Sequence, residues 1–255
     1  MRELKIRSSY RLPFVMDLVF GVLNLLIYFF ISKMFGVHSP ASLGGAPDYF
    51  AFVFVGIVLT TVVAAASSEV SRRMRQEQLA GTLEALLTQP LRSDQTAFGF
   101  AAMPILFGIF RCGVYLVLGT LWLGLDSGNA NWVGFAAVMV ATGWAMVGVG
   151  VLACAAVLVL KQGEVLAVIV AYAMGLLGGA WFTTAVLPDR LQTASRLVPT
   201  RYAFDGARRT LFTGEGWAGD VGILVAFGAV LLPVSLLAFR SALAQAKRAG
   251  SLGQY

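Results

Sequence analysis

The chain has 255 residues, of which 58% are hydrophobic and 13% are charged, and its formal net charge is +6 at pH 7. This much apolar surface exceeds what the core of one soluble domain can hide, which excludes an ordinary water-soluble protein. The positive charge does not indicate nucleic acid as a partner, because basic residues beside membrane helices orient a protein and contact lipid headgroups. We therefore expect membrane lipid as a partner and no nucleic acid.

The segment that precedes the first apolar run, residues 1–12, is basic and partly apolar. Leu4 and Ile6 can lie at the headgroup boundary while the cations of the segment reach outward. We expect an interfacial segment that anchors the chain. The run that follows is too long for the apolar region of a signal peptide, about 7–15 residues, so we expect it to be a retained helix.

Six apolar runs have about the length that a helix needs to cross a bilayer, which is roughly 20 residues for a hydrocarbon core about 30 Å thick. They are residues 13–35, 49–66, 97–125, 132–160, 165–187 and 221–239. Unbroken apolar runs favour helices over a membrane β-barrel, whose strands alternate apolar and polar residues. We predict an all-α integral membrane protein with six transmembrane helices, forming a single transmembrane domain over residues 1–255.

Lysine and arginine are distributed unevenly between the runs. They precede the first run, lie between the second and third and between the fourth and fifth, and follow the sixth, whereas residues 36–48 and 126–131 contain none. Cytoplasmic loops carry the excess of these residues, so both termini and the insert at residues 67–92 are expected in the cytoplasm.

The insert at residues 67–92 is charged and amphipathic. Its leucines fall on one face of a helix and are Leu79, Leu83, Leu86 and Leu87. Such a helix can press its leucines into a groove on a partner while charges at the rim fix the register. The alternative is a helix that lies on lipid, for which the three arginines at positions 72, 73 and 75 suffice.

One arginine, Arg111, falls near the middle of the third run. A charge that faces lipid there costs roughly 2.5–3.5 kcal/mol, so the side chain should face protein or water. Asn24 of the first run lies closer to this depth than Asp17 does, so we take Asn24 and Arg111 as candidate pathway or buried polar residues. Two roles stay open for Arg111: a structural arginine capped by polar groups, or one that binds an anionic headgroup or phosphate of a substrate.

The segment at residues 188–220 would lie outside, yet it carries five arginines, which four acidic residues largely offset. Asp205 can pair with Arg208 and Arg209 at helical spacings of three and four. We predict two short helices separated by Pro199, lying at or dipping into the outer surface. A seventh span is disfavoured because the segment lacks a run of about 20 apolar residues.

Residues for catalysis are sparse. The two cysteines lie within apolar runs, the single histidine has no second ligand near it, and no lysine follows the glycine spacing of a phosphate-binding loop. Asp17 is the only acidic residue well inside a run, so the paired carboxylates of proton-driven carriers are missing. We expect no catalytic residue, no metal and no cofactor in this chain.

Together these features resemble the membrane (permease) subunit of type-2 ABC transporters. The insert is similar to the family's cytoplasmic coupling helix between spans 2 and 3, through Glu77, Gly81, Thr82, Leu83, Glu84, Leu86, Leu87 and Pro90. The later segment is similar to its short external or re-entrant helices between spans 5 and 6, through Pro199, Thr200, Arg201, Tyr202, Asp205, Gly206 and Arg208. The resemblance implies partner coupling at the first set and an external gate formed by Pro199, Tyr202, Asp205 and Arg208.

The resemblance also implies partners. They are cytosolic ABC ATPase subunits that bind ATP and Mg, and a second permease copy or paralogue, in the cytoplasmic (inner) membrane of a prokaryote. Residues 1–12 resemble the family's connecting helix and could add to coupling. We expect an exporter of an amphipathic, lipid-linked or drug-like molecule, with a polysaccharide exporter, or an ATP-independent channel or scaffold, as alternatives.

Overall fold

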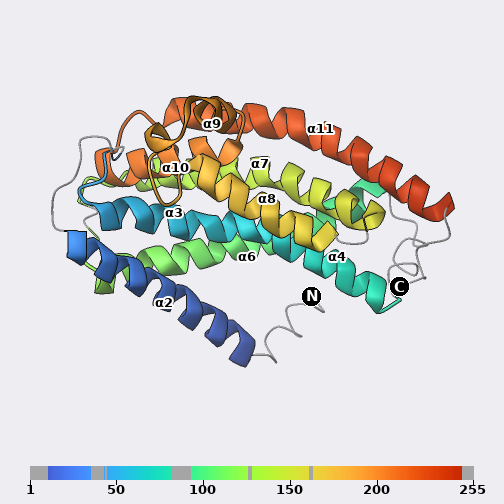
Figure 1. The fold of residues 1–255 in the computed structure, drawn as a ribbon, viewed down its shortest axis with the longest axis horizontal. Helices are drawn as coiled ribbons and strands as arrows, with labels where there is room; N and C mark the ends of the chain where they lie inside the picture. The colour runs from blue at the N-terminus through green and yellow to red at the C-terminus, as the bar shows by residue number, and fades with distance from the viewer. Residues whose placement is uncertain are drawn as a thin grey trace.

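The computed structural model describes residues 11–35, 43, 45–81, 93–125, 128–160 and 163–248. All regular secondary structure in these ranges is helical, which confirms the predicted all-α class. The long helices lie roughly side by side in an elongated bundle, with α11 along one side and α2 along the other (Figure 1).

The described helical elements include both long and short helices. They are α2 Arg11–Phe35, α3 Tyr49–Ala64, the π-helix η1 Ala65–Glu69, α4 Val70–Leu79, α6 Ser93–Trp122, α7 Trp132–Val159, α8 Gly163–Gly178, the 3-10 helix η2 Thr184–Val186, α9 Asp189–Ser195, α10 Pro199–Arg208, the π-helix η3 Arg209–Thr213 and α11 Ala218–Arg248.

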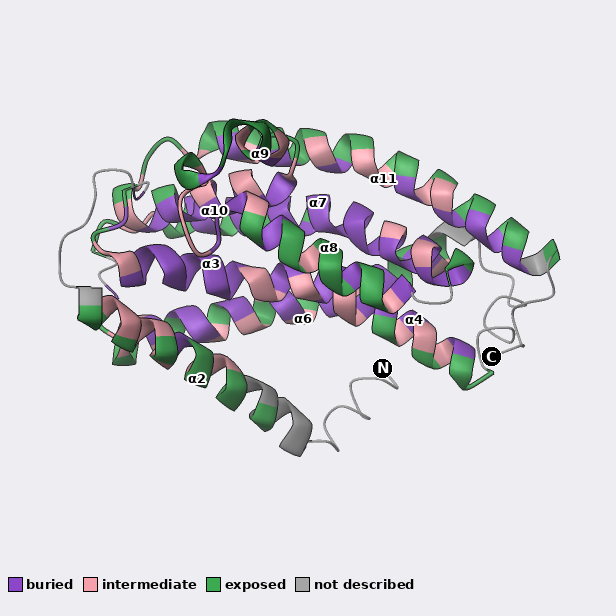
Figure 2. Cartoon of the chain, in the orientation of Figure 1, coloured by how far each residue is buried: buried purple, intermediate pink, exposed green. Residues whose placement is uncertain are grey.

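The centre of the bundle is formed by α3 and α7. Both helices are apolar around their whole circumference, which is typical of a helix surrounded by other helices or by lipid. Buried residues cover most of α3 and α7, whereas α2, α8 and α11 alternate between buried and exposed residues (Figure 2). The inner helices therefore form the core, and the outer helices present apolar side chains at the surface.

Within the described ranges, four helices are long and apolar enough to cross a membrane: Tyr49–Leu79, Gln95–Trp122, Trp132–Val159 and Ala218–Ala246. The first and fifth of the six predicted spans correspond to the shorter apolar helices Val19–Met34 and Gly163–Gly178. The fifth predicted span ends early because Gly179, at φ +80°, takes the left-handed conformation that glycine adopts without strain. The chain then turns back, and the Ala180 amide donates to the Gly175 carbonyl at 2.9 Å.

The second predicted span, in contrast, is shorter than the helix in the structure. The apolar run ends at Ala66, but the helix continues as η1 and α4 to Leu79. Its start is set by Asp48, whose carboxylate accepts a hydrogen bond from the Ala51 amide at 2.7 Å and so caps α3. Its continuation is stabilised by packing, because Val70 and Met74 are fully buried.

Candidate functional site

The short helix α10 lies inside the bundle, in contact with α3, α7, α8 and α11. Pro199 occupies its first turn, where a missing N–H costs nothing. Its buried residues include Thr200, Ala203, Phe204, Ala207 and Arg208. The Thr200 hydroxyl donates to the Met174 carbonyl of α8 at 2.6 Å, which places α10 close against α8. The preceding short helix, α9, ends at Ser195, so α9 and α10 are two separate helices and α10 begins at Pro199.

Arg208 joins three parts of the chain. Its side chain is 1% exposed. Nε and Nη2 donate to the Phe52 carbonyl of α3 at 3.2 and 3.1 Å. Nη2 also donates to the Gly179 carbonyl at 2.8 Å, and the guanidinium carbon lies 3.6 Å from the centroid of the Phe52 ring. We call this set, Arg208 with the carbonyls of Phe52 and Gly179, the Arg208 clamp.

The electrostatics of the clamp are set by burial. Burial lowers the pKa of Arg208 to about 10, and the Asp205 carboxylate opposes this shift, so the guanidinium remains charged at neutral pH. Burial likewise raises the pKa of Asp205, which the cations of Arg208 and Arg201 partly offset. The Asp205 carboxylate lies 3.7 Å from Arg208 Nη1 and 3.9 Å from Arg201 Nε.

Arg209 differs from the prediction. It begins the wider turn η3 and donates to the Asp220 carboxylate of α11 at 3.0 Å, where the sequence spacing predicted a pair with Asp205. A cavity of about 190 Å³ lies beside the clamp, lined by polar groups that include Thr183, Thr184 and Asp205. Two adjacent arginines therefore have different partners: Arg208 of α10 belongs to the buried clamp, and Arg209 of η3 forms a bridge to α11.

Tyr202 lies on the outer face of α10. Its hydroxyl donates to the Arg196 carbonyl at 3.0 Å, and its ring packs against Phe227 of α11 with centroids 5.9 Å apart. Of the four predicted gate residues, Pro199 begins α10 and Tyr202 connects α10 to the preceding turn and to α11. Arg208 belongs to the clamp, and Asp205 lies beside it. The structure thus brings these four residues together on one helix.

A second polar centre lies in the middle of the bundle. Arg111 of α6 donates from Nη2 to the Glu69 carboxylate at 3.1 Å, and the two side chains are only 15% and 18% exposed. Glu69 is the last residue of the π-helix η1, which packs against α6, α7 and α8. Single π-helical turns inside α-helices are frequent at functional sites. Glu69 was not among the polar residues predicted from the sequence, because the second span was predicted to end at Ala66.

Asn24, the other candidate polar residue, does not join this centre. It lies exposed on α2, and the main packing of α2 among the described helices is against α3. The ionic partner of Arg111 is therefore Glu69, which belongs to the continuous helix Tyr49–Leu79.

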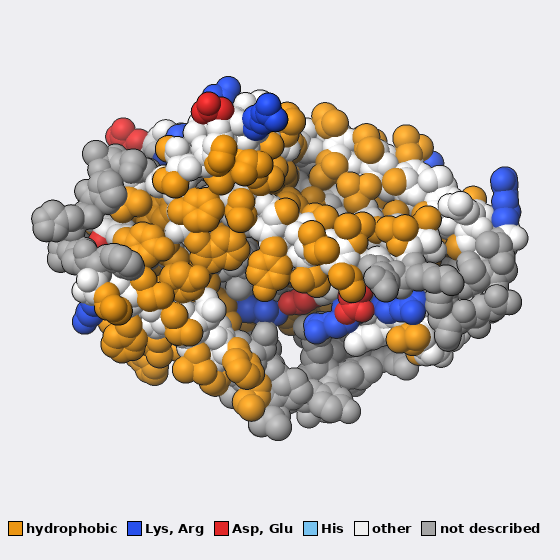
Figure 3. Space-filling model, in the orientation of Figure 1, with side chains coloured by type: hydrophobic (Ala, Val, Ile, Leu, Met, Phe, Trp, Pro, Cys, Tyr) orange, Lys and Arg blue, Asp and Glu red, His pale blue; other side chains and the backbone are white. Residues whose placement is uncertain are grey.

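The continuous helix Tyr49–Leu79 ends in the charged helix α4. Arg75 donates to the Gln78 side chain at 3.2 Å, Glu77 is half-buried, and Leu79 is exposed. Figure 3 shows Lys, Arg, Asp and Glu side chains gathered in a hollow over α4 beside the start of α8, while hydrophobic side chains dominate over α2 and α8. The chain turns at Ala80 and at Gly81, which has φ +68°.

This turn corrects one prediction. Leu79 was expected on the same helical face as Leu83, Leu86 and Leu87, but the helix ends at Leu79 because Gly81 takes a left-handed conformation. Of the predicted coupling residues, Glu77 and Gly81 are described. The others, Thr82, Leu83, Glu84, Leu86 and Leu87, lie outside the described residues, as does residue range 1–10 of the interfacial segment.

A bundle whose central helices are apolar on all sides, and in which Arg111 near the middle of α6 is paired with Glu69, defines a multi-pass α-helical membrane protein. Residues 2–212 match the family model described as ABC-2 type transporter. The chain therefore belongs to the ABC-2 type transporter family, which confirms the resemblance drawn from the sequence. Members of this family are membrane components of transporters and are not themselves catalytic. No curated protein matches the chain.

Proposed function

We propose that this chain is the permease subunit of an ATP-driven exporter, which moves an amphipathic, lipid-linked or drug-like molecule outward across the cytoplasmic membrane of a prokaryote. The observation that carries the proposal is the continuous helix Tyr49–Leu79 within the region matched to the ABC-2 family. This helix connects the charged end at α4 with the core of the bundle and with the Arg208 clamp.

The three polar contacts along this helix support a coupling role. At one end lie the charges of α4, in the middle Glu69 binds Arg111, and near the other end the Phe52 carbonyl binds Arg208. A partner that displaces α4 would move a helix whose other end is attached to α10. Closure of two ATP-bound partner subunits would in this way change the packing of the segment at residues 188–220, which we propose to be the external gate.

The rest of the assembly is part of the proposal. ATP and Mg would be bound by cytosolic ABC ATPase subunits that dock on residues 77–87, and a second permease copy or paralogue would complete the transport path. We propose that α2 and α8 supply the remaining two spans, with both termini in the cytoplasm, as the distribution of lysine and arginine favours.

The substrate class is proposed from the aromatic residues. A polysaccharide path would present ring faces to sugars, but Phe50 and Phe54 are buried and pack against each other, with centroids 5.6 Å apart. Phe29 packs edge-on against Phe50 at 5.2 Å. These three rings contribute to packing between α2 and α3 and do not form a row of stacked, accessible ring faces, which favours an amphipathic substrate over a polysaccharide.

The test is ATPase activity after co-expression with a candidate ABC ATPase, for example one encoded beside this chain. The wild-type chain should co-purify with the ATPase, and the double variant Leu83→Ala/Glu84→Ala should lose the docking or the coupling of ATP hydrolysis to transport. The control is Leu237→Ala/Ser241→Ala, which removes an exposed leucine and an exposed polar group one turn apart on α11. Absence of any association in wild type would favour a channel or scaffold.

A further inference from the structure

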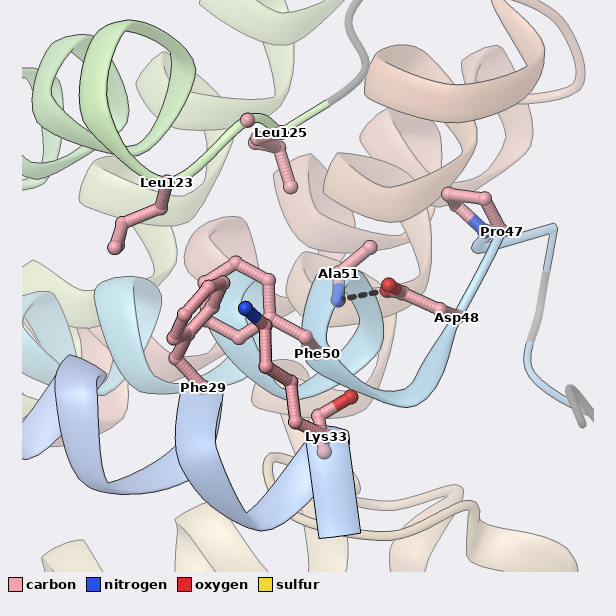
Figure 4. Close-up of a pocket in the computed structure, with 10 residues that line it drawn as sticks. Phe29, Lys33, Pro47, Asp48, Phe50, Ala51, Leu123 and Leu125 are labelled. Carbon is pink, nitrogen blue, oxygen red and sulfur yellow. Dashed lines mark hydrogen bonds between the residues drawn. The ribbon is translucent and has the colours of Figure 1, made fainter. Parts of the chain in front are cut away.

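A cavity of about 390 Å³ lies between the end of α2, the start of α3 and the residues that follow α6 (Figure 4). Its volume is within the range of pockets that hold small molecules, about 300–1,000 Å³. The lining from α2 includes Phe29, Ser32 and Lys33, and the opposite lining includes Asp48 and Leu125. This cavity is separate from the Arg208 clamp and from the Glu69–Arg111 pair.

Two opposite charges line this cavity from different helices. The Lys33 ammonium lies 4.6 Å from the centroid of the Phe29 ring. The Asp48 carboxylate is next to the start of α3, where one of its oxygens accepts the Ala51 amide hydrogen bond. Among the described residues, the ion pairs do not include Lys33 or Asp48. The cavity therefore presents a cation and an anion that do not neutralise each other.

The remaining lining is apolar or aromatic. Leu123 and Leu125 lie on the far side of the cavity, and the Phe29 and Phe50 rings form part of its wall (Figure 4). Large apolar side chains near the ends of the same two helices are exposed: Phe30 and Met34 on α2, and Leu121 and Trp122 on α6. Trp122 ends an apolar helix, and tryptophan is enriched where such helices meet the headgroup layer. The charged part of the cavity thus adjoins an apolar surface at the end of two membrane helices.

We propose that this cavity binds the headgroup of a zwitterionic phospholipid, with its acyl chains along the exposed apolar side chains of α2 and α6. The Lys33 ammonium would bind the phosphate as a point charge. The headgroup ammonium would bind beside the Asp48 carboxylate, whose negative charge attracts a cation. Asp48 would repel a headgroup that carries net negative charge and no ammonium. The inference goes beyond the proposed function, because it does not depend on ATP coupling or on the transported substrate.

The experiment is a lipid titration of the full-length detergent-purified protein, followed by native mass spectrometry. The probes are palmitoyl-oleoyl phosphatidylethanolamine and palmitoyl-oleoyl phosphatidylglycerol. Wild type should bind the first more tightly. Lys33→Met should weaken binding of both about tenfold, the effect of losing about 1.4 kcal/mol. Asp48→Asn should reduce the preference for phosphatidylethanolamine while keeping α3 capped, because asparagine caps a helix as well as aspartate does.

The matched control is Arg190→Met, which removes an exposed cation of α9 outside the cavity and should leave both affinities at the wild-type value. Equal binding by wild type, Lys33→Met and Arg190→Met would overturn the proposal and indicate unspecific lipid around the protein. A preference for phosphatidylglycerol in wild type would also overturn it. Competition by soluble glycerophosphoethanolamine at the same concentration as the lipid would exclude a lipid as the occupant, because the apolar surface would then contribute nothing.

Discussion

At Arg208, one buried guanidinium donates to backbone carbonyls of two segments that lie far apart in the sequence. Phe52 is 156 residues from Arg208 and Gly179 is 29 residues from it. Leaving a buried carbonyl without its hydrogen-bond donor costs about 1–3 kcal/mol of folding free energy. The clamp therefore stabilises the position of α10 through groups that no substitution of Phe52 or Gly179 can remove.

Replacement Arg208→Lys tests this role. Lysine keeps the charge but has no planar fork, so it cannot bind the two carbonyls in the same geometry. We expect a loss of about 1–3 kcal/mol of stability, measured as a lower melting temperature in detergent. The control is Arg209→Lys at the neighbouring, exposed position, where the change should be much smaller. Equal shifts for the two variants would contradict the clamp.

The burial of Arg208 was beyond what the sequence could indicate. The spacing from Asp205 to Arg208 predicted an ion pair, and the two groups lie 3.7 Å apart. The closer partners of Arg208, however, are main-chain carbonyls, which every residue possesses and which leave no pattern in the sequence. Glu69 was missed for a related reason: the helix continues past Ala66 because Val70 and Met74 pack in the core, and an isolated apolar run does not report such packing.

Among the elements, the π-helix η1 has the clearest consequence for the core. It places Glu69 within hydrogen-bonding distance of Arg111, and neighbouring Gly108 of α6 packs against Ala65. Replacing one member of a largely desolvated ion pair is strongly destabilising, because the other charge is left without its partner. This geometry favours the structural role for Arg111 over contact with a substrate.

A double-mutant cycle measures the pair. Glu69→Gln and Arg111→Gln should each lower the melting temperature, and the double variant should lose less than the sum of the two. The expected coupling energy is about 0.5–3 kcal/mol. Arg72→Gln, at an exposed position of α4, serves as the control. Strictly additive effects would mean that the pair contributes nothing, and unchanged stability with altered transport would restore the substrate role.

Element boundaries were the weakest part of the prediction from sequence. The helical class and the apolar cores of the helices follow directly from the runs. The end of α8 does not, because Gly178 and Gly179 lie within a stretch that remains apolar to Leu187. Gly178 also packs where a Cβ would lie 2.6 Å from the Thr200 hydroxyl oxygen, so its role is set by α10 and not by its sequence neighbours.

For the molecule as a whole, the helix Tyr49–Leu79 is the only described element that contributes to the charged end, the Glu69–Arg111 pair and the Arg208 clamp together. If coupling passes along this helix, breaking it between Met74 and Leu79 should separate ATP binding from movement of the proposed gate. Gln76 is suited to this test because it is exposed, so its substitution disturbs little packing.

The variant Gln76→Pro should kink α4, since proline removes a hydrogen bond and clashes with the preceding turn. The readout is the rate at which a maleimide labels Glu215→Cys, an exposed position before α11, with and without ATP in the assembled complex. The native cysteines Cys112 and Cys154 are buried and should not react. ATP should alter the rate in Gln76→Ala but not in Gln76→Pro; an equal response in both would contradict transmission along the helix.

The π-helix η1 also determines the directions in which the side chains of α4 point. A π-turn holds one residue more than an α-turn, and one residue corresponds to about 100° of rotation around the axis. The sides of α4 that face inward, with Met74, and outward, with Arg72 and Gln76, therefore depend on a single extra residue within Ala65–Glu69. A one-residue deletion there would turn a different set of side chains toward any docking protein, although the docking residues themselves would be unaltered.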